Sequence, residues 1–117
     1  MAVKRIVPDF AFENPEDVRA FYENVLGLKL VMNQGWIVTF ASDLPTTAQI
    51  SIASEGGSGA PVPDVSIEVD NIDEVYRNAK AGKYEIAYEL CNEPWGVRRF
   101  FVRDPTGRLL NILQHIG

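Results

Sequence analysis

The stretch VPDVSIEVDNIDEVYRNAKAG, residues 62–82, decides the fold because its pattern occurs twice in the chain. Its first part alternates apolar and polar residues, which predicts a strand with one buried face. Its second part predicts a helix that Asn71 caps and Gly82 ends. Residues 7–27 open with the same letters, VPD, and continue through a strand to a second helix of this kind. A duplicated supersecondary unit is a strong indication of fold.

Three short strands are expected after each helix, so the order strand, helix, strand, strand, strand occurs twice. The chain is therefore predicted to be an α+β protein, one domain made of two βαβββ repeats: repeat one at about 4–54, a flexible linker at 55–63 and repeat two at about 64–115. The expected strands are 4–12, 28–32, 36–41, 48–52, 64–69, 85–90, 97–103 and 108–113, and the first helix runs from Asn14 to Gly27.

Composition narrows the class of protein. The 117 residues suit one domain, and a 46% hydrophobic share is enough for a core. The net charge of −5 argues against nucleic-acid binding, which needs a basic surface. No apolar run approaches the ~18 residues of a membrane span. The start of the chain has no signal-peptide pattern, and the single Cys91 cannot form an internal disulfide, so a cytoplasmic location is expected.

Several short motifs carry a family resemblance. They are Phe21-Tyr22 followed by VLGL at 25–28, the strand-to-helix transition IEVDNID at 67–73, and EPWG at 93–96 leading through Phe100 to RDPTG at 103–107. Together they resemble the vicinal-oxygen-chelate superfamily of glyoxalases, bleomycin-resistance proteins and extradiol dioxygenases. The nearest resemblance is to the bleomycin-resistance-like, metal-free members. It is specific for fold and weak for reaction, because this superfamily includes lyases, dioxygenases, isomerases and binding proteins.

The resemblance implies mixed, curled sheets that form an open barrel-like cavity around a ligand. It also implies a homodimer, in which the N-terminal strand is often exchanged between subunits. Pro8 would suit the hinge of such an exchange because proline cannot pair in a continuous ladder. Pro8 would equally suit an ordinary edge strand.

The resemblance also tells where a metal would bind. Metalloenzymes of the superfamily carry His on the first strand of each half and Glu or His on the last. This chain has Asp9 and Asp64 at the first positions and Ser51 and Asn111 at the second. Because Zn, Ni and Fe prefer imidazole or thiolate ligands, no metal and no other cofactor is expected. The single histidine, His115, lies outside these positions and is expected to be solvated near the C-terminus.

Alternation along the strands predicts which side chains face the ligand. Asp9 would face it if Phe10 and Phe12 pack on the helix, and Asp64 would face it from the second half. Aromatic residues on the cavity-lining strands would stack on a flat ligand, with Trp95 the first choice. The full set of predicted ligand-binding residues is Asp9, Trp36, Phe40, Ser51, Asp64, Ser66, Glu68, Trp95, Arg99, Phe101 and Asn111.

Two interpretations of the acidic pair stay open. Asp9 and Asp64 would either recognise a basic group on the ligand or satisfy nearby backbone donors and arginines. The arginines considered are Arg98, Arg99 and Arg108.

The predicted function is metal-free binding of a small molecule, in which a dimer sequesters a planar or cationic antibiotic-like ligand as bleomycin-resistance proteins do. No catalytic residue is assigned. The main alternative is a metal-dependent lyase or dioxygenase, with a metal-free enzyme using Asp64 or Glu68 as general base as a variant of it. A third alternative is a subunit that binds a protein partner.

Overall fold

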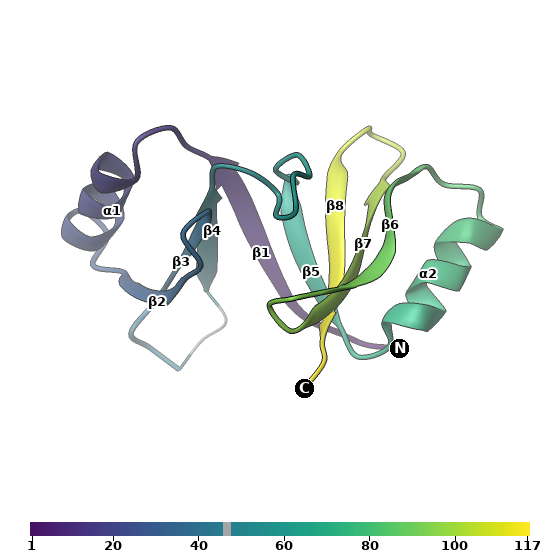
Figure 1. The fold of residues 1–117 in the computed structure, drawn as a ribbon. Helices are drawn as coiled ribbons and strands as arrows, with labels where there is room; N and C mark the ends of the chain where they lie inside the picture. The colour runs from purple at the N-terminus through teal and green to yellow at the C-terminus, as the bar shows by residue number, and fades with distance from the viewer. Residues whose placement is uncertain (46–47) are drawn as a thin grey trace. The chain divides into compact units, whose positions relative to one another are not determined.

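The chain consists of two compact units in the computed structural model, which describes residues 1–45 and 48–117. One unit comprises residues 7–62, and the other comprises residues 1–6 together with 63–117. Each contains one helix and a mixed sheet, and the order β-α-β-β-β occurs twice along the chain (Figure 1). The α+β class is therefore confirmed. Strand β1 (Val3–Ala11) contributes its first residues to one unit and its last residues to the other.

The 7–62 unit has the strand order β2-β3-β4-β1. The β2–β3 and β3–β4 pairs are antiparallel, whereas β4 and β1 run parallel, as a βαβββ connection requires. The side chain of Asn14 accepts a hydrogen bond from the backbone N–H of Glu16 at 3.1 Å, which confirms the expected N-cap. The elements are α1 (Pro15–Asn24), β2 (Lys29–Asn33), β3 (Ile37–Ala41) and β4 (Gln49–Ala53).

The core of this unit lies between α1 and the sheet. Phe40 of β3 is completely buried, and its ring stacks on Tyr22 of α1 with 5.4 Å between centroids. Ile52 of β4 is buried beside it on the same face. Phe10 of β1 is paired in register with Ile52 and is 52% exposed.

The unit of residues 1–6 and 63–117 has the strand order β1-β5-β8-β7-β6. The β5–β8 pair is parallel, and β8, β7 and β6 follow as antiparallel neighbours. Helix α2 covers one face of this sheet (Figure 1), over a buried cluster of Val69, Ile72, Phe100 and Ile112. The elements are β5 (Val65–Val69), α2 (Ile72–Ala81), β6 (Ile86–Glu93), β7 (Val97–Arg103) and β8 (Leu109–His115).

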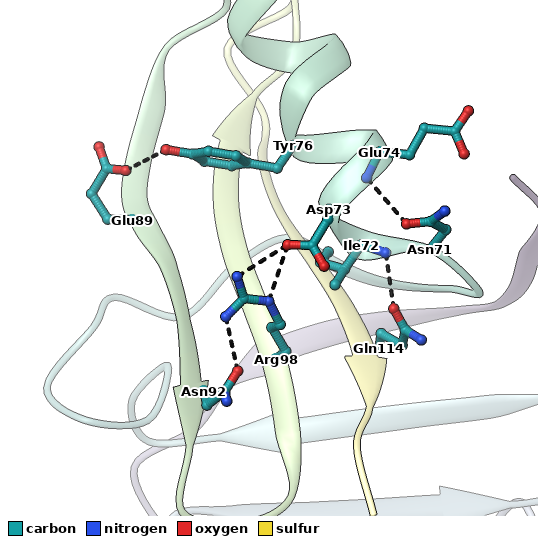
Figure 2. Close-up of polar contacts among 9 residues, drawn as sticks. All are labelled: Asn71, Ile72, Asp73, Glu74, Tyr76, Glu89, Asn92, Arg98 and Gln114. Atoms are coloured by element: carbon teal, nitrogen blue, oxygen red, sulfur yellow. Dashed lines mark hydrogen bonds and ion pairs between the residues drawn. The ribbon is translucent and has the colours of Figure 1, made fainter.

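Polar contacts hold the start of α2 against the sheet (Figure 2). Arg98 of β7 donates two hydrogen bonds to Oδ1 of Asp73, at 3.3 and 3.0 Å, and a third to Asn92 of β6 at 2.9 Å. Oε1 of Gln114 in β8 accepts the backbone N–H of Ile72 at 2.9 Å, one of the donors that a helix leaves unsatisfied at its start. Arg98 and Gln114 therefore point toward the helix.

Two strands of this unit extend further than the sequence pattern predicts. Strand β6 continues to Glu93 instead of ending at residue 90, and β8 continues to His115 instead of ending at residue 113. The pairing of β6 with β7 shifts register twice, between Ile86 and Tyr88 and again between Tyr88 and Cys91. A bulge interrupts the alternation of apolar residues, so the end of β6 was not visible as a strand.

Residues 55–63, predicted to be a flexible linker, contain a hydrogen-bonded turn. The backbone N–H of Gly56 donates to the carbonyl of Ala60 at 2.7 Å, and that of Ala60 donates to the carbonyl of Gly57 at 2.9 Å. A Cβ atom at Gly56 would lie 2.0 Å from the carbonyl oxygen of Pro61. The absence of a side chain at Gly56 therefore permits a tight turn in which its backbone approaches that of Pro61 closely.

Within the described parts of the chain, neither helix is a candidate for crossing a bilayer, because α1 and α2 have only 10 residues each.

Candidate functional site

The best-defined cluster of polar and aromatic side chains lies in the 63–117 part of the chain, on the sheet face opposite α2. On β7, Phe100 packs edge-on against Tyr76 of α2, with 5.1 Å between centroids, so Arg99 and Phe101 face the other way. On β8, Ile112 packs under α2, so its neighbours Asn111 and Leu113 also face away from it. We call this the distal face, defined by Ser66, Glu68, Tyr88, Cys91, Glu93, Trp95, Arg99, Phe101, Asn111 and His115.

Arg99 is the central residue of the distal face. Its side chain is 2% exposed and forms an ion pair with Glu93, whose side chain is 6% exposed, at 2.5 Å. Its guanidinium lies 4.9, 4.9 and 4.8 Å from the ring centroids of Tyr88, Trp95 and Phe101. A guanidinium is weakly hydrated and attracted to ring faces, so it tolerates this burial better than an ammonium would. The carboxylate supplies the charge that the buried cation needs.

Tyr88 and Cys91 complete the surroundings of Glu93. The Tyr88 hydroxyl donates to Glu93 Oε2 at 3.1 Å, and the Cys91 thiol lies 3.6 Å from Oε1. Burial raises the pKa of Tyr88, and the adjacent Cys91 and Glu93 raise it further, whereas Arg99 acts in the opposite direction. Tyr88 is therefore a neutral hydrogen-bond donor at physiological pH.

A second polar pair on the distal face joins β5 and β8. Nδ2 of Asn111 donates to the Ser66 hydroxyl at 3.0 Å, across directly paired positions of the two strands. Asn111 is 9% exposed, and its Oδ1 is buried without a hydrogen-bond partner among residues 1–45 and 48–117. A buried acceptor without a donor costs about 1–3 kcal/mol, so an N–H or O–H group of a ligand would be favourable here once the side chains that cover this oxygen moved to admit it.

Glu68 joins the two ends of the chain on this face. Its Oε1 lies 3.0 Å from Nε of Arg5, and its Oε2 lies 2.8 Å from Nδ1 of His115. Burial raises the pKa of Glu68, but the hydrogen bond from His115 and the charge of Arg5 outweigh it, so the net shift is downward. His115 is therefore a solvent-exposed residue near the C-terminus, as expected, but it lies in β8 and has a carboxylate partner.

Asp64 accepts a hydrogen bond from a nearby backbone donor, which is the second of the two interpretations left open for the acidic pair. It is exposed just before β5, and its Oδ2 accepts the backbone N–H of Leu109 at 2.8 Å. Two of the three arginines considered as its partners form ion pairs with other carboxylates, Arg98 with Asp73 and Arg99 with Glu93.

The residues at the superfamily's metal positions do not fit a transition-metal site. Asp64 is engaged with the backbone, and Asn111 offers one amide oxygen, which is a weak ligand for Zn, Ni or Fe. In the described parts of the chain, no three His, Cys, Asp or Glu side chains gather where they could hold a metal ion.

The 7–62 unit positions its predicted site residues differently. Asp9 and Ser51 are paired across β1 and β4, and the Ser51 hydroxyl lies 2.7 Å from the Thr39 hydroxyl. This small polar row lies on the face opposite α1. Phe40 was predicted to line the ligand groove, but it packs against α1 on the other face, because it alternates with Thr39 along β3. Trp36 is half-buried just before β3.

The structure thus brings together six of the predicted residues on the distal face: Ser66, Glu68, Trp95, Arg99, Phe101 and Asn111. Sequence reasoning missed Tyr88 and Glu93, and it considered His115 only as a lone residue near the C-terminus without a partner. The position of Glu93 beside Trp95 in the EPWG motif was a usable signal. Tyr88 gave none, because the bulges of β6 separate it from the alternating pattern.

Comparisons with solved structures agree with this fold. A structure described as NAD-dependent benzaldehyde dehydrogenase from Legionella pneumophila shares 19% identity, with 94% of this chain and 98% of that chain covered and a TM-score of 0.75. A glyoxalase/bleomycin resistance protein/dioxygenase superfamily member from Vibrio splendidus 12B01 shares 21% identity, with 97% and 99% covered and a TM-score of 0.68. Methylmalonyl-CoA epimerase from Mycobacterium tuberculosis shares 16% identity, with 98% and 88% covered and a TM-score of 0.69.

No curated protein matches the chain. The family model of the Glyoxalase/Bleomycin resistance protein/Dioxygenase superfamily matches residues 9–112, which is most of the sequence and includes the motifs around Phe21, Trp95 and Asp104. The chain belongs to this superfamily.

Proposed function

We propose that the protein binds a planar small molecule that carries a cationic or N–H donor group, and that it does so without a resident transition metal. The observation that carries the proposal is the buried Oδ1 of Asn111, which has no hydrogen-bond donor within the described residues. Asn111 itself is paired in register with Phe101 of the neighbouring strand. An acceptor beside an aromatic ring suits a flat ligand with a donor at its edge. Sequestration of an antibiotic-like compound by a homodimer is the specific form of this proposal.

The aromatic residues support the planar part of the ligand. Trp95 and Tyr88 are only half-buried, so their rings retain accessible surface while the guanidinium of Arg99 holds them in place. Flat rings stack on flat heterocycles and shield them from water. Arg99 contributes little net charge, because Glu93 neutralises it.

The charge of the chain supports a cationic ligand. The net charge of −5 attracts cations over distances of about 8–10 Å at moderate salt. The donor chemistry at Asp64 and Asn111 disfavours a Lewis-acid metal, which the alternative lyase or dioxygenase reaction would need.

The test is a fluorescence titration of Trp95 in a Trp36→Phe background, in which Trp95 is the only indole. The probes are bleomycin, the planar cation 9-aminoacridine and the planar anion anthracene-9-carboxylate. We expect quenching by at least one cationic probe and weaker quenching by the anion. Trp95→Ala, followed by calorimetry, should weaken binding by about 1–3 kcal/mol if the ring stacks on the ligand. Asn111→Leu should weaken it by about 1 kcal/mol or more.

The matched control is Arg98→Ala, which removes a side chain from the same strand on the face toward α2 and should leave affinity unchanged. Failure of every cationic probe to bind, or unchanged affinity in both Trp95→Ala and Asn111→Leu, would contradict the proposal. Elemental mass spectrometry of untagged protein adds an independent check. Close to one equivalent of a transition metal per chain would instead favour the lyase or dioxygenase alternative.

A further inference from the structure

Glu68 and His115 have a geometry that simple surface ion pairs lack. The Glu68 side chain is 13% exposed and is contacted at both carboxylate oxygens, with Arg5 on Oε1 and His115 on Oε2. The His115 side chain is 57% exposed. One partner thus anchors the carboxylate, and the carboxylate in turn anchors an imidazole that remains open to solvent.

The hydrogen bond fixes which nitrogen of His115 carries the proton. The pKa of Glu68 is lowered, so Glu68 is ionised at neutral pH and can only accept hydrogen bonds. The contact at 2.8 Å therefore requires a proton on Nδ1 of His115. In the neutral imidazole, Nε2 then has its lone pair available. A free neutral histidine prefers the opposite tautomer, so the protein imposes this arrangement.

The imidazole also lies close to the proposed ligand surface. His115 is paired in register with Val97, two residues after Trp95, and the backbone N–H of Ile116 donates to the carbonyl of Gly96 at 2.9 Å. These contacts fix the end of β8 beside the start of β7. A molecule stacked on Trp95 would thus lie at the same end of the sheet as the imidazole.

We propose that Glu68 and His115 form a proton-transfer dyad, in which Nε2 of His115 accepts a proton from a small molecule bound on the distal face. The substrates that fit are those with a proton to lose, namely a hydroxyl group or a C–H bond beside a carbonyl. The O–H or C–H bond breaks, its electron pair stays on the substrate, and an N–H bond forms at Nε2. Glu68 stabilises the resulting imidazolium, and return of the proton restores the resting state without any oxidant or reductant.

This inference goes beyond the capture of a planar cation, because it needs only that some small molecule with a proton to lose reaches the distal face. A protein that captures no planar cation would still hold His115 in the stated tautomer. Conversely, a variant in which the dyad is broken would still bind a planar ligand on Trp95. Failure of one proposal is therefore distinguishable from failure of the other.

The first readout is ¹⁵N NMR of the imidazole, which is simple to assign because the chain contains one histidine. At alkaline pH we expect the Nδ1–H tautomer to dominate in the wild type and the Nε2–H tautomer to gain in Glu68→Ala. The matched control is Glu85→Ala, which removes an exposed carboxylate paired with Arg103 and should leave the tautomer unchanged. A wild-type spectrum dominated by the Nε2–H tautomer would overturn the proposal.

The second readout is the rate of carbethoxylation of His115 by diethyl pyrocarbonate. Nε2 forms a bond to a carbonyl carbon of the reagent, ethyl carbonate leaves, and the Nδ1 proton passes to Glu68 and then to solvent. We expect the reaction to be about tenfold slower in Glu68→Ala, by analogy with the loss of about 10–100-fold in affinity or activity when the carboxylate partner of a metal-ligating histidine is removed. Equal rates in a folded Glu68→Ala protein, with folding checked by its melting temperature, would show that Glu68 does not activate the imidazole.

Discussion

The two units share an order of elements but differ in the chemistry of the sheet face opposite their helix. In the 7–62 unit this face carries a row of small polar side chains, Asp9, Ser51 and Thr39, with the two hydroxyls 2.7 Å apart. In the 63–117 part of the chain the corresponding face carries the buried ion pair of Arg99 and Glu93 among three aromatic rings. A repeated backbone thus fixes which positions face away from the helix, and the side chains at those positions decide what each face can do.

The largest expected effect comes from breaking the ion pair on the aromatic face. Arg99→Ala leaves the carboxylate of Glu93 buried without its cation and removes three cation–ring contacts. We expect a loss of about 3–5 kcal/mol in the free energy of unfolding, measured by urea denaturation. If the loss is below about 1 kcal/mol, the buried pair is not a principal support of this face.

The control for Arg99 is its neighbour Arg98, whose ion pair with Asp73 is partly exposed. Arg98→Ala should cost about 0–1 kcal/mol, because exposed pairs are screened by water. A similar loss for both variants would show that the cost reflects removal of any arginine from β7, not burial of a charge.

An intermediate effect is expected on the small polar face. Thr39→Val keeps the shape of the side chain but removes the hydroxyl that contacts Ser51, and both residues are buried. We expect a loss of about 1–2 kcal/mol in the free energy of unfolding. The double variant Thr39→Val with Ser51→Ala should recover part of it, since no lone buried hydroxyl remains. A double variant less stable than the single one would contradict this explanation.

The smallest effect concerns pH and tests the connection through Glu68. Burial raises the pKa of Glu68, but the hydrogen bond from His115 and the charge of Arg5 outweigh this effect, so the pKa lies below its ordinary value. A carboxylate whose pKa is depressed on folding stabilises the protein above its unfolded-state pKa, and that contribution is lost as the pH falls through the folded-state value. Stability should therefore decline more steeply below about pH 4.5 in the wild type than in Glu68→Gln. Parallel curves from urea denaturation at successive pH values would contradict this.

Local chemistry made much of the fold predictable. Asn14 and Asn71 were recognisable as helix caps because a cap needs only a side-chain oxygen within three residues of the helix start. The alternation in residues 64–69 correctly separated Ile67 and Val69, which pack with α2, from Ser66 and Glu68, which face away from it. The same reasoning failed for Phe40, because alternation alone does not say which of two faces the helix covers.

The candidate site was less predictable, because it depends on contacts between strands that lie far apart in sequence. Trp95 was named as a candidate from its motif and Asn111 from its repeat position, whereas alternation did not decide which residues of the 97–103 strand, Arg99 among them, face the ligand. Arg99 was considered as one possible partner of Asp9 or Asp64, whereas the pairing of β6 with β7 lets it form an ion pair with Glu93. The glycine-rich residues 55–63 gave no signal for the turn that the hydrogen bond from Gly56 to Ala60 defines.

The sequence by itself determined the order of the elements, the helix caps and the superfamily, because these depend on short-range patterns that each segment carries alone. Only the tertiary structure decided that Arg99 is buried against Glu93 among three rings, and that Glu68 joins Arg5 to His115. The physical reason is that charge pairing and burial depend on distances through space. The register of β5, β7 and β8 sets those distances, and no segment specifies that register alone.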